Sequence, residues 1–136
     1  MSFALSSALQ AAVYTRLVGD AEIAALVGPH VFDALPAGPV PSLYVVLGAE
    51  KVRDASDQGG AGAWHDFGVL VVSDSAGFAA SKSVAGAVCD ALIDAPLSLV
   101  RGRLVSLRFR KAAASRVGTG DTRRIDLTFR ARVSDE

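Results

Sequence analysis

Cysteine and histidine are scarce in this chain of 136 residues. Cys89 is its only cysteine, which excludes a disulfide bond within the chain. The only two histidines are His30 and His65, and neither has a cysteine or another histidine at metal-ligand spacing. We therefore predict no metal site, and a buried, inert thiol at Cys89.

An excess of charge and a long apolar run are also missing. Fourteen basic side chains balance fourteen acidic ones, so the total charge gives no polycationic attraction for nucleic acid. No run of about 18 apolar residues occurs, which excludes a membrane-spanning helix. No charged segment followed by an apolar one marks secretion. We expect a protein made in the cytoplasm, with no membrane partner.

Motifs for catalysis or cofactor binding are absent as well. The glycine-rich stretches 59–62 and 118–120 are not followed by the Lys-Ser/Thr pair of a phosphate-binding loop, so both are interpreted as turns. His65 and Asp66 are neighbours in a predicted strand, where their side chains point to opposite faces and are poorly placed to act as a pair. Ser73 and Ser75 are interpreted as the N-cap of the next helix. The sequence predicts no enzyme and no cofactor.

The chain does contain many apolar residues, and they recur at regular spacings. Apolar residues make up 51% of it, enough for a core in a single domain covering residues 1–136. From Phe67 to Val72 both faces of a strand are mainly apolar, which indicates a central strand covered on both sides by a helix, a partner or a neighbouring chain. The helix that follows, ending near Asp94, has one apolar stripe, formed by Val84, Ala87, Val88, Ala91, Leu92 and Ala95.

Two helices are predicted before the first strand. The first runs from Phe3 to Val18, with Ser2 as N-cap and Gly19 as a left-handed stop. The second runs from Ala21 to Val27, capped by Asp20 and closed by Gly28. A brief extended piece from His30 to Asp33 and a surface loop with Pro36, Pro39 and Pro41 complete this part of the chain.

Four strands are predicted, over Ser42–Asp54, Trp64–Ser73, Arg103–Arg110 and Arg123–Val133. The third places Val105, Leu107 and Phe109 inward. The fourth places five apolar side chains inward: Ile125, Leu127, Phe129, Ala131 and Val133. The fold class is therefore predicted as α+β, with a largely antiparallel four-stranded sheet and helices packed mainly on one face, in the order α, short α, β, β, α, β, β.

Arginines gather in the last third of the chain and point outward from the predicted strands. They form either a solvated face or a contact surface for another chain. The segment from Arg53 to Ala63 has no apolar anchor, and we expect it to be mobile in the free subunit and to become ordered on assembly. The candidate interface residues are Arg53, Asp54, Asp57, Arg108, Arg110, Arg124, Arg130 and Arg132.

Several short segments together carry a resemblance to a known family. They are the helix Ala8–Tyr14, the sequence motifs Leu26-Val-Gly and His30-Val-Phe-Asp-Ala34, the strand from Pro41 to Val46, and the arginine-rich final hairpin. Over nearly the whole chain they resemble tail-completion or tail-terminator proteins of long-tailed bacteriophages, and especially those of alphaproteobacterial gene transfer agents. The resemblance implies a structural virion protein that forms a ring, commonly sixfold. Such a ring caps the tail tube, stops its polymerisation and joins it to the neck.

The partners implied by the resemblance are other copies of the chain, the tail tube protein and a head–neck stopper or connector protein. DNA is implied only as cargo passing through the channel, and the protein is expected in the virion or phage-like particle.

Two other functions stay open at this point. One is a small-molecule-binding or enzymatic α+β domain with a pocket between the loop Pro36–Pro41 and the sheet, using His30, Tyr44 or His65. The other is a tail-assembly chaperone or connector elsewhere in the same particle.

Overall fold

The computed structural model describes residues 2–56, 60–75 and 77–135. Its elements are α1 (Ser6–Val18), α2 (Ala21–Val27), β1 (Val31–Phe32), β2 (Leu43–Asp54), β3 (Gly62–Ser73), α3 (Ala79–Leu92), β4 (Arg103–Arg116) and β5 (Arg123–Ser134). None of the described helices is long and apolar enough to cross a lipid bilayer.

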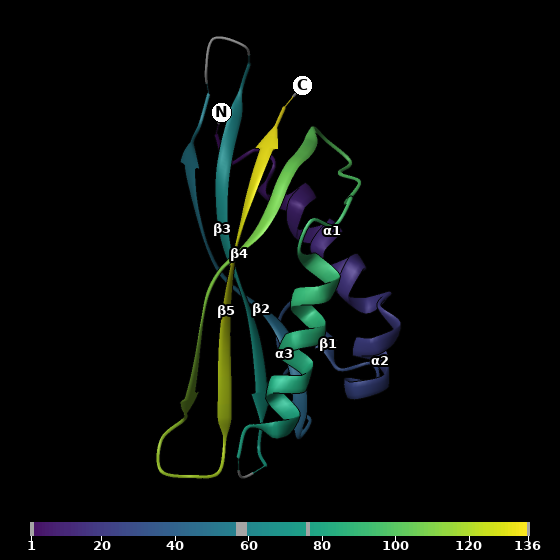
Figure 1. Ribbon diagram of the computed structural model, residues 1–136, viewed down its shortest axis with the longest axis vertical. Coiled ribbons are helices and arrows are strands. Elements are labelled where there is room, and N and C mark those ends of the chain that lie inside the picture. Colours follow the sequence, from purple (N-terminus) through teal and green to yellow (C-terminus); the bar gives the residue numbers. More distant parts are fainter. Residues whose placement is uncertain (1, 57–59, 76, 136) are drawn as a thin grey trace.

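The strands form one sheet in the order β1-β2-β3-β5-β4, with β3 in the middle (Figure 1). All neighbouring strands are antiparallel except β1 and β2, which run parallel. The prediction of an α+β fold is confirmed, but the prediction of four strands was wrong. The extended piece after His30 adds a two-residue fifth strand, because the long proline loop lets the chain return and lie parallel to it. A strand this short carries no periodic signal in the sequence.

The helices lie together on one face of the sheet, where the core is (Figure 1). The predicted stripe of α3 is buried from Val84 to Ala95, and the predicted inward side chains of β5 are buried too. Phe129 of β5 is stacked on Phe67 of β3 with ring centroids 5.7 Å apart. Cys89 is only half-buried, contrary to the prediction, because it lies at the margin of this stripe. Burial, with the nearby Asp90 charge, still raises the pKa of its thiol.

The ends of the helices follow the sequence signals unevenly. Asp20 caps α2 as predicted, accepting a hydrogen bond from the backbone N–H of Ile23 at 3.0 Å. Helix α1 ends at Val18 as predicted, but it begins at Ser6 and not at Phe3, and Gly19 is not the predicted left-handed stop, because its φ is −83°. The predicted cap of α3 was also wrong. Ser73 instead accepts a bond from the Ser75 N–H within a turn that precedes the helix.

Strand β4 differs most from its prediction. It extends to Arg116 and has two bulges, after Leu104 and after Phe109. A bulge inserts one extra residue, which reverses the alternation of side chains beyond it. Of the three side chains predicted to point inward, Leu107 is 1% exposed, whereas Val105 lies at the first bulge and is 51% exposed. Phe109 lies on the inward face beside Phe129, with ring centroids 6.0 Å apart, but is 43% exposed at the sheet edge.

Candidate assembly interface

The face of the sheet opposite the helices, here called the open face, carries no helix or strand among the described residues (Figure 1). At the β2 end, where Tyr44 and Val46 lie, its side chains are buried. Strand register places side chains from four strands in rows across one end of it. One row joins Arg53, Trp64, Arg132 and Ser106, and the next joins Lys51, Asp66, Arg130 and Arg108. The central strand is thus covered by helices on one side only, and Trp64, Asp66, Leu70 and Val72 stay half-buried on the other.

Trp64 is the centre of these rows. The guanidinium carbon of Arg132 lies 5.1 Å from the centroid of its ring, and that of Arg130 lies 5.5 Å away. Arg132 also donates a hydrogen bond to the backbone oxygen of Ala55 at 2.8 Å. Two cations on one indole form a stiff platform, because cation–π contact and hydrogen bonding both restrict the long side chains.

Asp66 is the acidic member of the rows. Its carboxylate accepts two hydrogen bonds from Arg130, at 2.7 and 3.0 Å. The Arg130 bond, with the charges of Arg130, Arg110 and Arg53, lowers the pKa of Asp66. Asp66 therefore stays ionised at neutral pH and fixes Arg130, while the other basic groups keep this end of the face positive.

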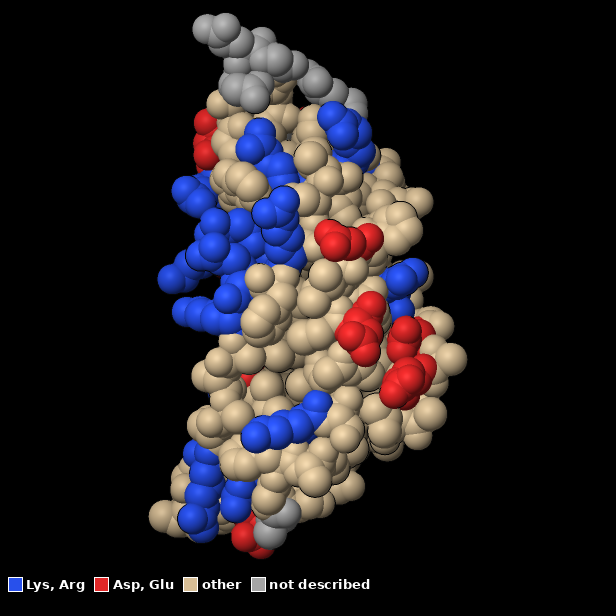
Figure 2. Space-filling view, in the orientation of Figure 1, with Lys and Arg blue, Asp and Glu red and all other residues tan. Residues whose placement is uncertain are grey.

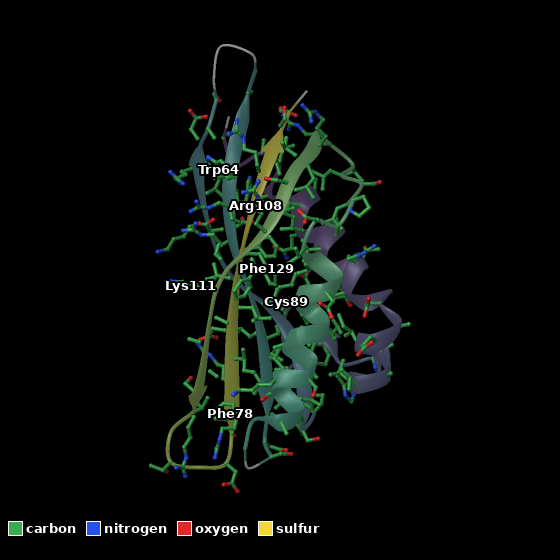
Figure 3. All side chains as sticks on the ribbon, viewed as in Figure 1. Trp64, Phe78, Cys89, Arg108, Lys111 and Phe129 are labelled. Atoms are coloured by element: carbon green, nitrogen blue, oxygen red, sulfur yellow. The ribbon has the colours of Figure 1, made fainter. Side chains whose placement is uncertain are left out.

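The arginine cluster consists of Lys51, Arg53, Arg108, Arg110, Lys111, Arg130 and Arg132. Figure 2 shows basic side chains gathered on this side of the molecule. In Figure 3, Trp64 and Arg108 lie at the same end of the sheet, with Lys111 further along β4. Lys51, Trp64, Asp66 and Lys111 were not among the predicted site residues, because only cross-strand register brings them beside the arginines.

The other predicted site residues lie apart from the cluster. Arg124 is further along β5, opposite Val72, and its side chain binds the Asp126 carboxylate at 2.7 Å. Asp54 is the last residue of β2 and accepts a hydrogen bond from the Ser56 hydroxyl at 2.6 Å. Asp57 lies outside the described residues.

The two flanks of the segment from Arg53 to Ala63 are anchored, and residues 57–59 between them lie outside the described residues. Arg53 and Asp54 belong to β2, and Ala63 is fully buried in β3. The Ala55 N–H bonds to the Gly62 oxygen, and the Asp135 N–H bonds to the Ala61 oxygen. The prediction of a segment without an apolar anchor was therefore wrong for Ala63, and backbone pairing adds to this anchor. Mobility in the free subunit and ordering on assembly stay a prediction.

A groove of about 560 Å³ crosses the open face beside the cluster. Its lining is mixed: Ala49, Lys51, Asp66, Phe67, Gly68, Leu70, Arg110, Lys111, Arg124, Asp126, Leu127 and Thr128. The described residues contain no group of three or more His, Cys, Asp or Glu that could hold a metal ion. Arginine and aromatic side chains are enriched at protein contact surfaces, and the lining contains both, together with lysines and carboxylates.

The alternative pocket is not assembled by the fold. His65 is fully buried on the helix side of the sheet, where its Nδ1 lies 3.3 Å from Glu50 Oε2. Tyr44 lies on the opposite face, across from Val72, and the ring of His30 is stacked against Phe32. The three polar groups proposed for that pocket therefore do not converge.

A helix-covered sheet with a free, arginine-bearing face offers a surface of the kind through which proteins contact other chains. Comparison with known proteins identifies the class more closely. The chain belongs to the family described as tail completion protein gp17, which it matches over residues 11–134. It is therefore a structural phage tail protein and not an enzyme, and the resemblance seen in the sequence is confirmed.

A solved structure carries the same fold. A chain from the structure titled "Virion of native gene transfer agent (GTA) particle" is 59% identical to this one, with a TM-score of 0.93. The match covers 98% of this chain and 99% of that one. No curated protein sequence matches the chain.

Proposed function

We propose that this tail completion protein forms a ring, with six copies, that caps the last ring of the tail tube. The ring stops polymerisation of the tube and joins it to the head–neck stopper proteins, while DNA passes through its channel as cargo. The observation that carries the proposal is the open face with its arginine cluster, on a chain whose 59% identical relative was solved within a virion.

The two edges of the sheet support a ring over a symmetric dimer. One edge is the fourteen-residue strand β4, and the other is β2, partly covered by the two-residue β1. Unlike edges suit a heterologous contact, in which one surface of a subunit meets a different surface of the next. Such contacts form an open filament unless rotation closes them into a ring.

The free protein is expected to be monomeric under dilute conditions. A contact of about 1,000 Å² or less is weak between separate molecules. At the end of a tail tube, neighbouring docking sites raise the effective concentration, and the same contact then holds the ring together. Ring formation would in this way depend on a finished tube.

Deletion of the gene in a particle-producing strain tests this function. We expect tails of irregular length without attached heads, and full recovery when the wild-type chain is supplied from a plasmid. Electron microscopy of the particles gives tail length and head attachment. Microscopy and native mass spectrometry of the neck give the copy number.

A single copy at the neck, or normal joined tails without the protein, would contradict the proposal. A tail-assembly chaperone would be absent from finished particles, whereas the 59% identical relative was solved in one.

A further inference from the structure

The chain has no net charge, yet its charges are separated in space. The arginine cluster lies on the open face, and Figure 2 shows acidic side chains gathered over the helices on the other side of the molecule. The acidic helix surface is defined by Asp20 and Glu22 at the start of α2 and by Asp90 and Asp94 at the end of α3. The basic surface of one copy is therefore opposite in charge to the acidic surface of another.

The helix ends that carry these carboxylates contact one another. Arg16, in the last turn of α1, donates a hydrogen bond from its Nε to the backbone oxygen of Ala91 in the last turn of α3, at 2.9 Å. Asp20 follows four residues after Arg16, and Asp90 is next to Ala91. Glu22, Asp90 and Asp94 are exposed. The exposed Arg16 guanidinium offsets the carbonyl end of α3, so the negative charge of this surface comes from the four side-chain carboxylates.

We propose that the arginine cluster of one copy docks on the acidic helix surface of the next copy. This inference rests on the proposed ring and adds a contact between faces to the contact between sheet edges. Basic and acidic surfaces on opposite sides of one subunit define a head-to-tail arrangement, which is the heterologous geometry that a ring requires. Arginines held by Trp64 and Asp66 are already ordered before docking, so less side-chain freedom is lost.

The composition of the open face favours a protein occupant over DNA. Leu70 and Val72 lie on the same face as the cluster, and Asp66 and Asp126 line the groove. Carboxylates repel a phosphate backbone, and apolar side chains find no partner in it. A second copy of this chain offers carboxylates for the arginines.

A charge exchange between the two surfaces tests the contact. One variant carries Arg108→Glu with Lys111→Glu, and a second carries Glu22→Lys with Asp90→Lys; all four residues are exposed. A third variant combines the four changes. The matched control, Asp74→Lys with Lys82→Glu, reverses two exposed charges near the start of α3, away from both surfaces.

Incorporation into purified particles is measured for each variant in a strain that lacks the wild-type chain. We expect about a tenfold loss for each single-surface reversal and recovery to within about threefold of wild type for the combined variant, since only the combination restores opposite charges. The control should assemble normally. Circular dichroism should show melting temperatures within about 5 °C of wild type for every variant.

Failure of the combined variant to recover, with its fold intact, would overturn the contact. A loss confined to the Arg108 and Lys111 variant would overturn it too, because the cluster would then bind a different acidic molecule, either another tail protein or DNA. The copy number in wild-type particles distinguishes failure of this contact from failure of the proposed ring. A ring in those particles, without recovery of the combined variant, would contradict only the contact. A single copy would contradict the ring itself.

Discussion

At the scale of single residues, the least expected feature is a half-buried polar contact between α1 and the sheet. Glu50 accepts hydrogen bonds from the Ser6 hydroxyl of α1 and from His65 Nδ1 of β3. Glu50 reaches this site because a bulge between Leu47 and Glu50 turns it to the helix side. Burial alone would raise its pKa, but the bonds from His65 and Ser6 outweigh burial and lower it.

We predict that Glu50→Gln lowers the free energy of unfolding at pH 7 by about 1–3 kcal/mol. A folded-state pKa below the ordinary value of 4.5 means that the carboxylate stabilises the fold above that pH. This contribution is lost as the pH falls through the folded-state pKa, so the gap between variant and wild type should narrow in acid. Urea unfolding at pH 7 and at about pH 3.5 measures it.

The matched control is Glu22→Gln, on the exposed start of α2, which should change stability by under about 0.5 kcal/mol. A gap for Glu50→Gln that is equal at both pH values would show that its carboxylate charge contributes nothing.

Among the helices and strands, the start of β4 depends on one glycine. Gly102 has a φ of +69°, and a Cβ atom there would lie 2.5 Å from the Ser134 oxygen and 2.8 Å from Leu5 Cδ1. Gly118, in the β4–β5 turn, has a φ of +63°, but a Cβ atom there would meet nothing within 4 Å. The two positions share backbone strain and differ in steric contact.

We predict that Gly102→Ala destabilises the fold by about 2–4 kcal/mol, and Gly118→Ala by about 1 kcal/mol. The first change adds a clash with Leu5, just before α1, and with Ser134 of β5 to the strain, whereas the second adds strain alone. Thermal and urea unfolding of both variants give the comparison. Equal losses would show that the close approach at Gly102 relaxes without cost.

In the molecule as a whole, β4 is the strand with the longest exposed stretch. Its residues from Arg108 to Arg116 are exposed, on the edge of the sheet beside the arginine cluster. In the free chain, the amides on its outer edge therefore lack a neighbouring strand among the described residues.

We predict that these outer-edge amides exchange rapidly in the free chain and are protected in assembled particles. Strand β5, which pairs on both sides, should be protected in both states and serves as an internal control. Hydrogen exchange with mass spectrometry measures both strands in one experiment. Unchanged exchange in β4 would show that this side of the sheet stays uncovered after assembly.

The features of the fold that depend on local periodicity could be predicted from the amino-acid sequence. The stripe of α3, the inward side chains of β5, the Asp20 cap and the central position of β3 all follow from regular spacing of apolar residues or from one capping side chain. Such signals are carried by neighbours in the chain, so they can be read without knowledge of the three-dimensional structure. The resemblance to tail-completion proteins rests on local patterns of the same kind.

The register of the strands, and therefore the site, became known only from the folded chain. Bulges in β2 and β4 reverse the alternation of side chains, which brings Glu50 inward and exposes Val105. Cross-strand pairing collects Trp64, Asp66 and the basic side chains of three other strands into one cluster, and leaves Arg124 outside it. The physical reason is that pairing energies depend on residues distant in sequence, so a single inserted residue changes every contact beyond it without a local signal.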